Sequence, residues 1–120
     1  MFFTFDNNLP IYIQLVQQLK INIISGRLRP LERLPSVREL AMQTKVNPNT
    51  MQKALAELEE TGLIFTERTN GKFVTADTAL IARYRREYAE EMADSFLKNM
   101  AQIGLDREQS MQYLQELGGK

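Results

Sequence analysis

Three polar side chains, Asn49, Gln52 and Lys53, fall on one face of a predicted helix. Asn and Gln amides donate and accept hydrogen bonds at once, which suits the edge of an adenine, and Lys suits guanine. Thr50, one step round the helix, suits a phosphate or the methyl group of thymine. These residue types in this pattern favour the reading of base edges in DNA. The helical wheel alone is explained equally well by an ordinary solvated face.

Two further groups of residues have the chemistry to contact the DNA backbone or the minor groove. Arg38 falls in the first turn of the preceding predicted helix, where free backbone N–H groups and a cation together favour a phosphate. Gly71 and Lys72 follow Asn70 at the tip of a predicted hairpin, where a glycine permits close approach and a lysine meets the negative potential of the minor groove. Each group also has a simpler reading, because Arg38 could pair with a neighbouring glutamate and Asn70-Gly71 is a common turn sequence.

The residue types that most enzymes and metal sites need do not occur in the sequence. The chain of 120 residues has no Cys and no His, so the commonest general base and the usual zinc ligands are missing. No P-loop, G-x-G-x-x-G or G-x-S-x-G motif occurs. The acidic group Glu90, Glu91 and Asp94 is typical of a solvated helix face. We therefore predict that the protein is not an enzyme and holds no cofactor and no metal.

The composition is typical of a soluble globular protein, with 43% hydrophobic and 25% charged residues. Its formal net charge is zero, so composition by itself does not indicate a nucleic-acid partner. No apolar run approaches the roughly 18 residues of a membrane helix, and the N-terminal segment lacks the pattern of a secretory signal. Together with the lack of Cys, these features predict a cytoplasmic protein that does not contact the membrane.

Three helices are predicted in the first half of the chain. The first covers about residues 10–25, with Ile13 in its apolar stripe. The second covers about residues 36–44 and begins at a Ser-x-x-Glu capping box. The third covers about residues 47–61 and begins at Asn47, which is better explained as a helix cap than as a base reader.

A β-hairpin is predicted next, with strands at residues 63–68 and 73–75 joined by Asn70-Gly71. Three helices followed by a hairpin are typical of a winged helix, and the short break between the second and third helices makes a helix-turn-helix. We predict a mainly α fold with a small β-hairpin. A winged helix-turn-helix domain covers residues 1–75, and a two-helix dimerisation tail covers residues 76–120.

The predicted tail carries an apolar face that the winged helix cannot cover, because the helical stripes of the winged helix are already used in its own core. A long helix broken at Gly104 and a short helix capped by Asp106 share this face. A large exposed apolar patch invites association, so we predict an isologous dimer through these helices. The residues expected in the contact are Tyr84, Tyr88, Met92, Phe96, Met100, Leu114 and Leu117.

Residues 10 to 75 resemble the winged-helix DNA-binding domain of the GntR family of bacterial transcription regulators. The resemblance rests on P-I-Y, S-G-R-L, L-P-S-V-R-E-L-A, V-N-P-N-T, A-L-x-x-L-E-x-x-G-L-I and G-K-F-V, in this order. V-N-P-N-T and the short tail resemble the YtrA-like subgroup, in which the tail is two dimerising helices. One departure is Leu31, which stands where the family usually has Gly. The resemblance implies a wing tip at Gly71 and DNA-contacting positions at Arg38, Asn49, Thr50 and Gln52.

The leading interpretation is a homodimeric transcription regulator, a repressor that binds a palindromic operator in double-stranded DNA near its own operon. Members of the subgroup often sit beside genes for ABC transporters. With so short a tail, a small-molecule effector would bind between the tail and the winged helix or across the dimer, with Tyr84, Tyr88 and Phe96 as its wall. The alternative is a winged helix that serves as a protein-interaction module without DNA binding.

Overall fold

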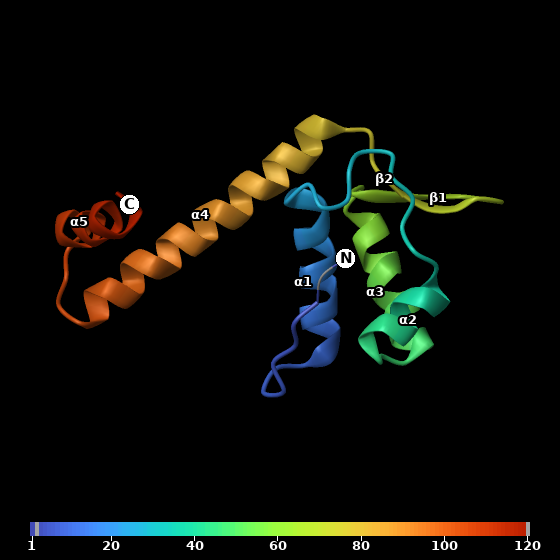
Figure 1. The fold of residues 1–120 in the computed structure, drawn as a ribbon, viewed down its shortest axis with the longest axis horizontal. Helices are drawn as coiled ribbons and strands as arrows, with labels where there is room; N and C mark the ends of the chain where they lie inside the picture. Colours follow the sequence, from blue (N-terminus) through green and yellow to red (C-terminus); the bar gives the residue numbers. More distant parts are fainter. Residues whose placement is uncertain (2, 120) are drawn as a thin grey trace. The chain divides into compact units, whose positions relative to one another are not determined.

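The computed structural model describes residue 1 and residues 3–119 of the chain. Five helices and one two-stranded antiparallel hairpin follow one another along this part of the chain (Figure 1). The predicted fold class, mainly α with a small β-hairpin, is confirmed. In chain order the elements are α1 (Ile11–Ile24), α2 (Val37–Thr44), α3 (Pro48–Glu60), β1 (Ile64–Glu67), β2 (Gly71–Val74), α4 (Thr78–Gln102) and α5 (Arg107–Gly118).

The chain divides into two compact units, residues 1–84 and residues 85–120. The division falls inside α4, because the first turns of this helix pack on the first unit. Ile81 is buried, and Leu80 Cδ2 lies 3.2 Å from the place where a β-carbon would stand at Gly62. The Lys20 ammonium lies 5.8 Å from the centre of the Tyr84 ring, a cation–π contact. The first unit therefore extends beyond residue 75.

Side-chain caps hold the helix starts of the helix-turn-helix. Ser36 Oγ accepts a hydrogen bond from the Glu39 N–H at 3.1 Å, and Glu39 Oε1 accepts one from the Ser36 N–H at 3.3 Å. This confirms the predicted capping box. α2 ends at Thr44, and the φ of 58° at the next residue, Lys45, turns the chain out of the helix. Asn47 Oδ1 then accepts from the Asn49 N–H at 2.8 Å and caps α3, as predicted.

The core of the first unit forms where α1, α2, α3 and the hairpin meet. One residue of α1 does not follow the prediction. Ile13, assigned to the apolar stripe of this helix, is 60% exposed, because it lies about 200° round the helix from the buried Leu15. The buried apolar side chains include Leu15, Leu19, Ile23, Leu40, Met51, Ala54, Leu55, Leu58, Leu63, Ile64 and Val74.

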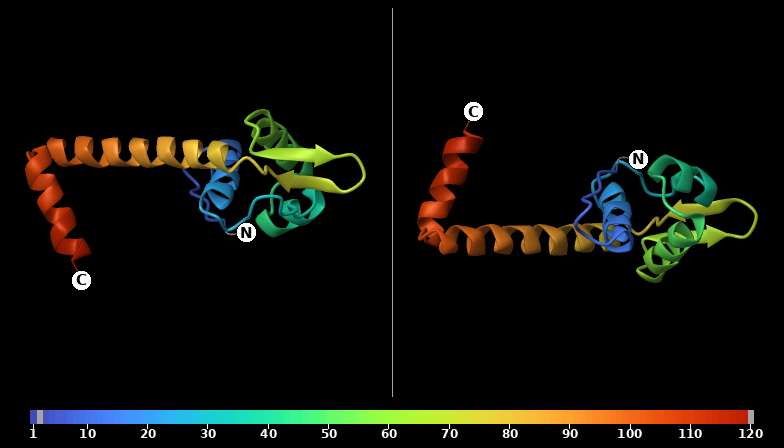
Figure 2. Two further views of the ribbon diagram at one scale, coloured as in Figure 1. Left: turned by 90° about the horizontal axis from the view of Figure 1, so that it is seen from above. Right: turned by 90° about the horizontal axis from the view of Figure 1, so that it is seen from below.

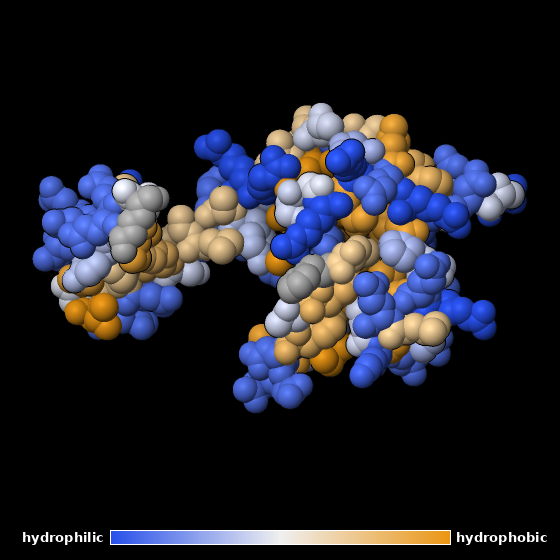
Figure 3. Space-filling model, viewed as in Figure 1, coloured by the Kyte–Doolittle hydropathy of each residue, from blue (hydrophilic) through white to orange (hydrophobic). Residues whose placement is uncertain are grey.

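The segment before α1 is held against this helix by two glutamine side chains. The buried Gln14 donates to the backbone oxygens of Asp6 at 2.6 Å and Leu9 at 2.9 Å, and its Oε1 accepts from the Asp6 N–H at 2.6 Å. Gln18 forms a similar two-way pair with the backbone of Thr4. Apolar side chains remain exposed here, Leu9 and Ile13 among them, and an apolar region is visible over this part of the surface (Figure 3).

The hairpin turns one residue earlier than the sequence predicts. β1 and β2 pair antiparallel, and the last pair before the turn joins Glu67 to Gly71. The connection is therefore residues 68–70, and Gly71 is the first residue of β2, with a φ of 100°. The prediction that Gly71 belongs to the turn together with Asn70 is wrong, because a three-residue connection followed by a glycine at positive φ closes this hairpin.

The loop that leads into α2 adds a backbone ladder to the hairpin. The Leu31 N–H donates to Val74 O at 2.9 Å, and the Leu34 N–H donates to Lys72 O at 2.8 Å. Leu31 has a φ of 66°, a left-handed conformation that costs a side-chain-bearing residue more than it costs glycine. The ladder ties the loop to β2, and the free end of the hairpin projects beyond the helices (Figure 2).

The second unit contains the rest of α4 and all of α5. Gly104, with a φ of 90°, follows the end of α4. Asp106 Oδ1 accepts from the Gln109 N–H at 2.8 Å, and Gln109 Oε1 accepts from the Asp106 N–H at 3.0 Å, which confirms the predicted cap of the last helix. Across residues 1 and 3–119, no helix is both long enough and apolar enough to cross a membrane.

Candidate nucleic-acid interface

The two faces of α3 differ as the helical wheel predicts. One face is buried and contains Met51, Ala54, Leu55 and Leu58. On the other face Asn49, Gln52 and Lys53 are exposed, and Thr50 is half-buried. The first turn of α3 carries no acidic residue. The side chains predicted to read bases are therefore on the solvent side of the helix, free of the core.

Asn47 has a structural role that competes with base reading. It is exposed, but its Oδ1 accepts the Asn49 N–H at 2.8 Å. A cap of this kind stabilises a helix by about 1 kcal/mol. The oxygen therefore already accepts one hydrogen bond, and the cap fixes the orientation of the Asn47 amide.

Arg38 is the second residue of α2 and is exposed. The glutamates that could have paired with it are used elsewhere. Glu39 accepts the Ser36 N–H in the capping box, and Glu32 Oε1 accepts the Arg29 N–H at 3.0 Å. Within residues 1 and 3–119, no ion pair to Arg38 is seen. Arg38 thus lies in the first turn of α2, where the first backbone N–H groups lack intrahelical acceptors.

Lys72 does not lie at the hairpin tip, in contrast to the prediction from the sequence. It pairs with Thr66 within the ladder. Its Nζ lies 3.1 Å from Glu59 Oε1 and 2.8 Å from Thr66 Oγ1, and Thr66 Oγ1 also donates to Glu59 at 2.5 Å. The ammonium therefore faces α3. Its contact with DNA stays a prediction, and the three-residue tip itself carries Arg68.

The Glu59 carboxylate joins the recognition helix to the wing. The hydrogen bond from Thr66 lowers the pKa of Glu59 most, desolvation raises it in part, and the Lys72 ammonium lowers it further. A shallow groove of about 410 Å³ lies beside this network and is lined by Gln52, Ala56, Glu59, Glu60 and Lys72. The C-terminal part of α3 thus carries acidic side chains, so the residues predicted to read bases all lie in its N-terminal half.

Glu59→Gln is expected to lower the free energy of unfolding at pH 7 by up to about 1 kcal/mol, since the Glu59 side chain is 40% exposed. The pKa of Glu59 is lower in the folded state than its ordinary value of 4.5. Its contribution is therefore present above that ordinary value and is lost as the pH falls through the lowered one. Urea unfolding of both proteins from neutral to acid pH measures the difference.

Glu60→Gln is the matched control for this experiment, because it removes the same charge from the next residue of α3, outside the Lys72 network. Its unfolding free energy should follow wild type over the same range of pH. A Glu59→Gln deficit of equal size at acid and neutral pH would show that packing, and not the charge, is responsible.

Arg33 and Arg68 are exposed beside the wing. The sequence does not predict either of them as a DNA contact. Arg33 lies in the loop that precedes α2, and its backbone pairs with Phe73 of β2. Arg68 lies in the hairpin connection. The sequence does not indicate that Arg33 lies beside the wing, because this position depends on the pairing of the loop with β2.

The sequence and the fold match known proteins over most of the chain. Residues 11–74 match the family model for bacterial regulatory proteins of the gntR family. The chain belongs to the GntR family. The transcriptional repressor YtrA of Bacillus subtilis (strain 168) is 35% identical over 118 residues, which cover 92% of this chain and 90% of YtrA. This likeness supports the YtrA-like subgroup within the GntR family.

Solved structures agree with the family assignment. A GntR family transcriptional regulator from Listeria monocytogenes superposes with a TM-score of 0.87 and is 37% identical, covering 93% of this chain and 98% of that protein. The DNA-binding domain of AraR in complex with operator ORE1 superposes with a TM-score of 0.54 at 27% identity, over 62% of this chain and 94% of that domain. The protein is a DNA-binding GntR transcription regulator and not an enzyme.

Proposed function

We propose that this GntR protein is a homodimeric repressor that binds a palindromic operator near its own operon. The observation that carries the proposal is the exposed, acid-free N-terminal face of α3 on a winged helix. In a helix-turn-helix the N-terminal residues of the second helix reach base edges in the major groove. Base reading falls to Asn49, Gln52 and Lys53, with Thr50 placed for a phosphate or a thymine methyl.

The proposed dimer follows from how little DNA one recognition helix can read. One helix contacts only a few base pairs. So short a sequence recurs many times in a genome, so one helix cannot distinguish an operator from the competing sites. Two copies related by a two-fold axis read half-sites roughly 34–36 Å apart, or a multiple of this distance. The tail is proposed to hold the copies together, because its apolar residues have no apolar core of their own. Leu117 is 74% exposed and Met92 is 62% exposed.

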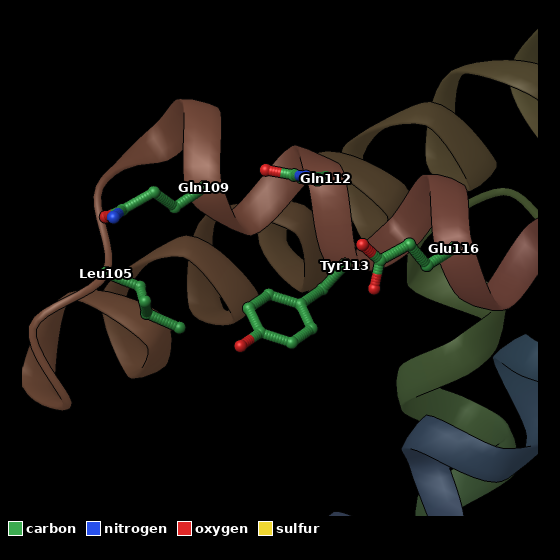
Figure 4. Close-up of a pocket in the computed structure, with 5 residues that line it drawn as sticks. All are labelled: Leu105, Gln109, Gln112, Tyr113 and Glu116. Carbon is green, nitrogen blue, oxygen red and sulfur yellow. The ribbon is translucent and has the colours of Figure 1, made fainter.

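A pocket on α5 supports the same role for the tail. It has a volume of about 220 Å³ and is lined by Leu105, Gln109, Gln112, Tyr113 and Glu116. Leu105 and Tyr113 face the same space (Figure 4). Tyr113 and Leu117 are four positions apart on α5 and so share a face of this helix, which places the pocket beside the apolar surface proposed for the dimer. Operons for ABC transporters are proposed as targets because the sequence resembles the YtrA-like subgroup.

The other candidate is a winged helix that binds a protein and not DNA. A protein-binding face would be expected to carry apolar or mixed-charge side chains at its centre. The polar side chains in the N-terminal half of α3 are instead those of Asn, Thr, Gln and Lys. The first acidic residue of the helix is Glu57. A gel retardation assay with the DNA upstream of the gene separates the two. Stronger retardation of that DNA than of a random duplex supports the proposal. Equal retardation of the two DNAs, or no retardation of either, contradicts it.

Arg38→Ala is expected to weaken binding to the operator and to random DNA alike. Its guanidinium is placed for a phosphate, so the variant should flatten the dependence of log K on log salt by about one unit. Fluorescence anisotropy at several salt concentrations measures this slope. Arg107→Ala is the matched control, because Arg107 also lies in the first turn of a capped helix. A loss confined to the operator would show that Arg38 reads a base.

A further inference from the structure

A cleft separates the hairpin from the chain that leads into α2. Its volume is about 270 Å³. Arg33, Ser36 and Val37 line one side, and Arg68, Thr69 and Gly71 line the other. The two sides come from segments that the fold brings together through the ladder between the loop and β2. Charged side chains on both sides make the cleft a candidate binding site that lies apart from the base-reading face of α3.

The position of Arg33 is fixed by its backbone and by a glycine. Arg33 pairs with Phe73 in an antiparallel bridge, so the direction of its side chain is set by the ladder. Its Nε and Nη2 atoms lie 3.3 Å and 3.5 Å from the place where a β-carbon would stand at Gly71. Any side chain there would meet the guanidinium, and the φ of 100° would strain it further. Gly71 therefore permits the close approach of Arg33 to the wing.

The charges in the cleft are not balanced by the protein. Within residues 1 and 3–119, no ion pair or hydrogen bond is seen for the guanidinium of Arg33 or of Arg68. Lys72 also lines the cleft, but its ammonium is held by Glu59. An acidic residue, Glu67, lines the cleft as well, and its Oε2 accepts from the Asn70 amide at 3.1 Å. Two guanidinium groups, those of Arg33 and Arg68, therefore face one carboxylate, Glu67, which already accepts a hydrogen bond.

We propose that this cleft holds one phosphate of the DNA backbone, with Arg33 and Arg68 as its ligands. Planar guanidinium groups match the oxygens of a phosphate with paired hydrogen bonds, which a lone ammonium cannot do. The first N–H groups of α2 have no intrahelical acceptor, and Val37 at the start of this helix lines the cleft. The inference rests on the proposed DNA-binding function, and it assigns to the wing a phosphate contact through Arg68 and not through Lys72.

The test uses the full chain and a random-sequence DNA duplex, because a phosphate contact does not depend on the operator. Binding is measured by anisotropy between about 50 and 200 mM salt for wild type, Arg33→Gln, Arg68→Gln and the double variant. The double variant should lower the slope of log K against log salt by about 0.9, the value for one phosphate. Each single variant should lower the slope by only part of that amount, since the remaining arginine still faces the same phosphate.

Arg29→Gln is the matched control. It removes the same charge from the same loop, but Arg29 does not line the cleft. It should leave the slope near that of wild type. Equal slopes for Arg29→Gln and Arg33→Gln in a protein that binds the duplex would overturn the inference alone. A slope loss of about 1.8 in the double variant would also overturn it, because the two arginines would then hold separate phosphates. A wild-type protein that binds no duplex at low salt would overturn the proposed function as well.

Two further measurements distinguish a DNA phosphate from a free phosphate ion and from misfolding of the variant. Far-UV circular dichroism shows whether Arg33→Gln is folded; if it is not, Arg68→Gln, on the exposed turn, decides alone. Sodium phosphate is titrated against sodium chloride of equal ionic strength while thermal unfolding is followed. The expected result is no difference between wild type and Arg33→Gln. Stabilisation by phosphate that Arg33→Gln abolishes, with unchanged DNA slopes, would make the cleft a site for free phosphate and overturn the proposal.

Discussion

Leu114→Glu combined with Leu117→Glu is expected to convert the proposed full-length dimer to a monomer and to weaken operator binding by about 10²–10⁴-fold. Both side chains are exposed on α5, within the apolar surface proposed as the dimer contact. A carboxylate there would be buried without a partner, which strongly disfavours association. Sedimentation gives the oligomeric state, and anisotropy with the operator gives the affinity.

Gln115→Glu is the control for this double variant. It places the same charge on the same helix, between the two leucines in the chain but on a different side of the helix. This control should stay dimeric. A second check uses residues 1–84 alone, because the buried Ile81 shows that the first unit needs the start of α4. These residues should form a folded monomer. Dimerisation of residues 1–84, or of the leucine double variant, would mean that the tail has another role.

Gln52→Ala is expected to cost about 1–3 kcal/mol of operator binding and to relax the preference at one base position. Asn49→Ala should have an effect of similar size at a different position. Both side chains lie on the exposed face of α3, and truncation removes amide groups that can bind a base edge in two places at once. Binding measured against operators with each base pair changed in turn gives the preference.

Gln17→Ala is the matched control, since Gln17 is an exposed glutamine of α1. Its affinity and base preference should equal those of wild type. The salt dependence separates base readers from phosphate ligands. Gln52→Ala should leave the slope of log K against log salt unchanged, whereas Arg38→Ala should reduce it. If Gln52→Ala and Asn49→Ala both bind the operator as tightly as wild type, with unchanged base preference, base reading lies elsewhere.

Much of the winged helix could be predicted from the sequence because its signals are local. The capping boxes at Ser36 and Asp106 form between residues three positions apart, and the sequence alone shows both partners. The exposed face of α3 follows from the helical repeat once the apolar positions are known. The lack of Cys and His leaves the chain without the side chains that the common catalytic and zinc chemistries require.

The tertiary structure decided the features that depend on segments distant in the chain. Glu59 and Lys72 meet across 13 positions, and Arg33 lies over Gly71 because its loop pairs with β2. A side-chain pair of this kind has no local repeat, since its geometry depends on the register of the hairpin and of the ladder beside it. For this reason the sequence alone determined the helices and the exposed face of α3 that is proposed to read bases. Only the packed fold decided that Lys72 faces α3, that Arg68 lies at the wing tip, and that α4 begins inside the first unit.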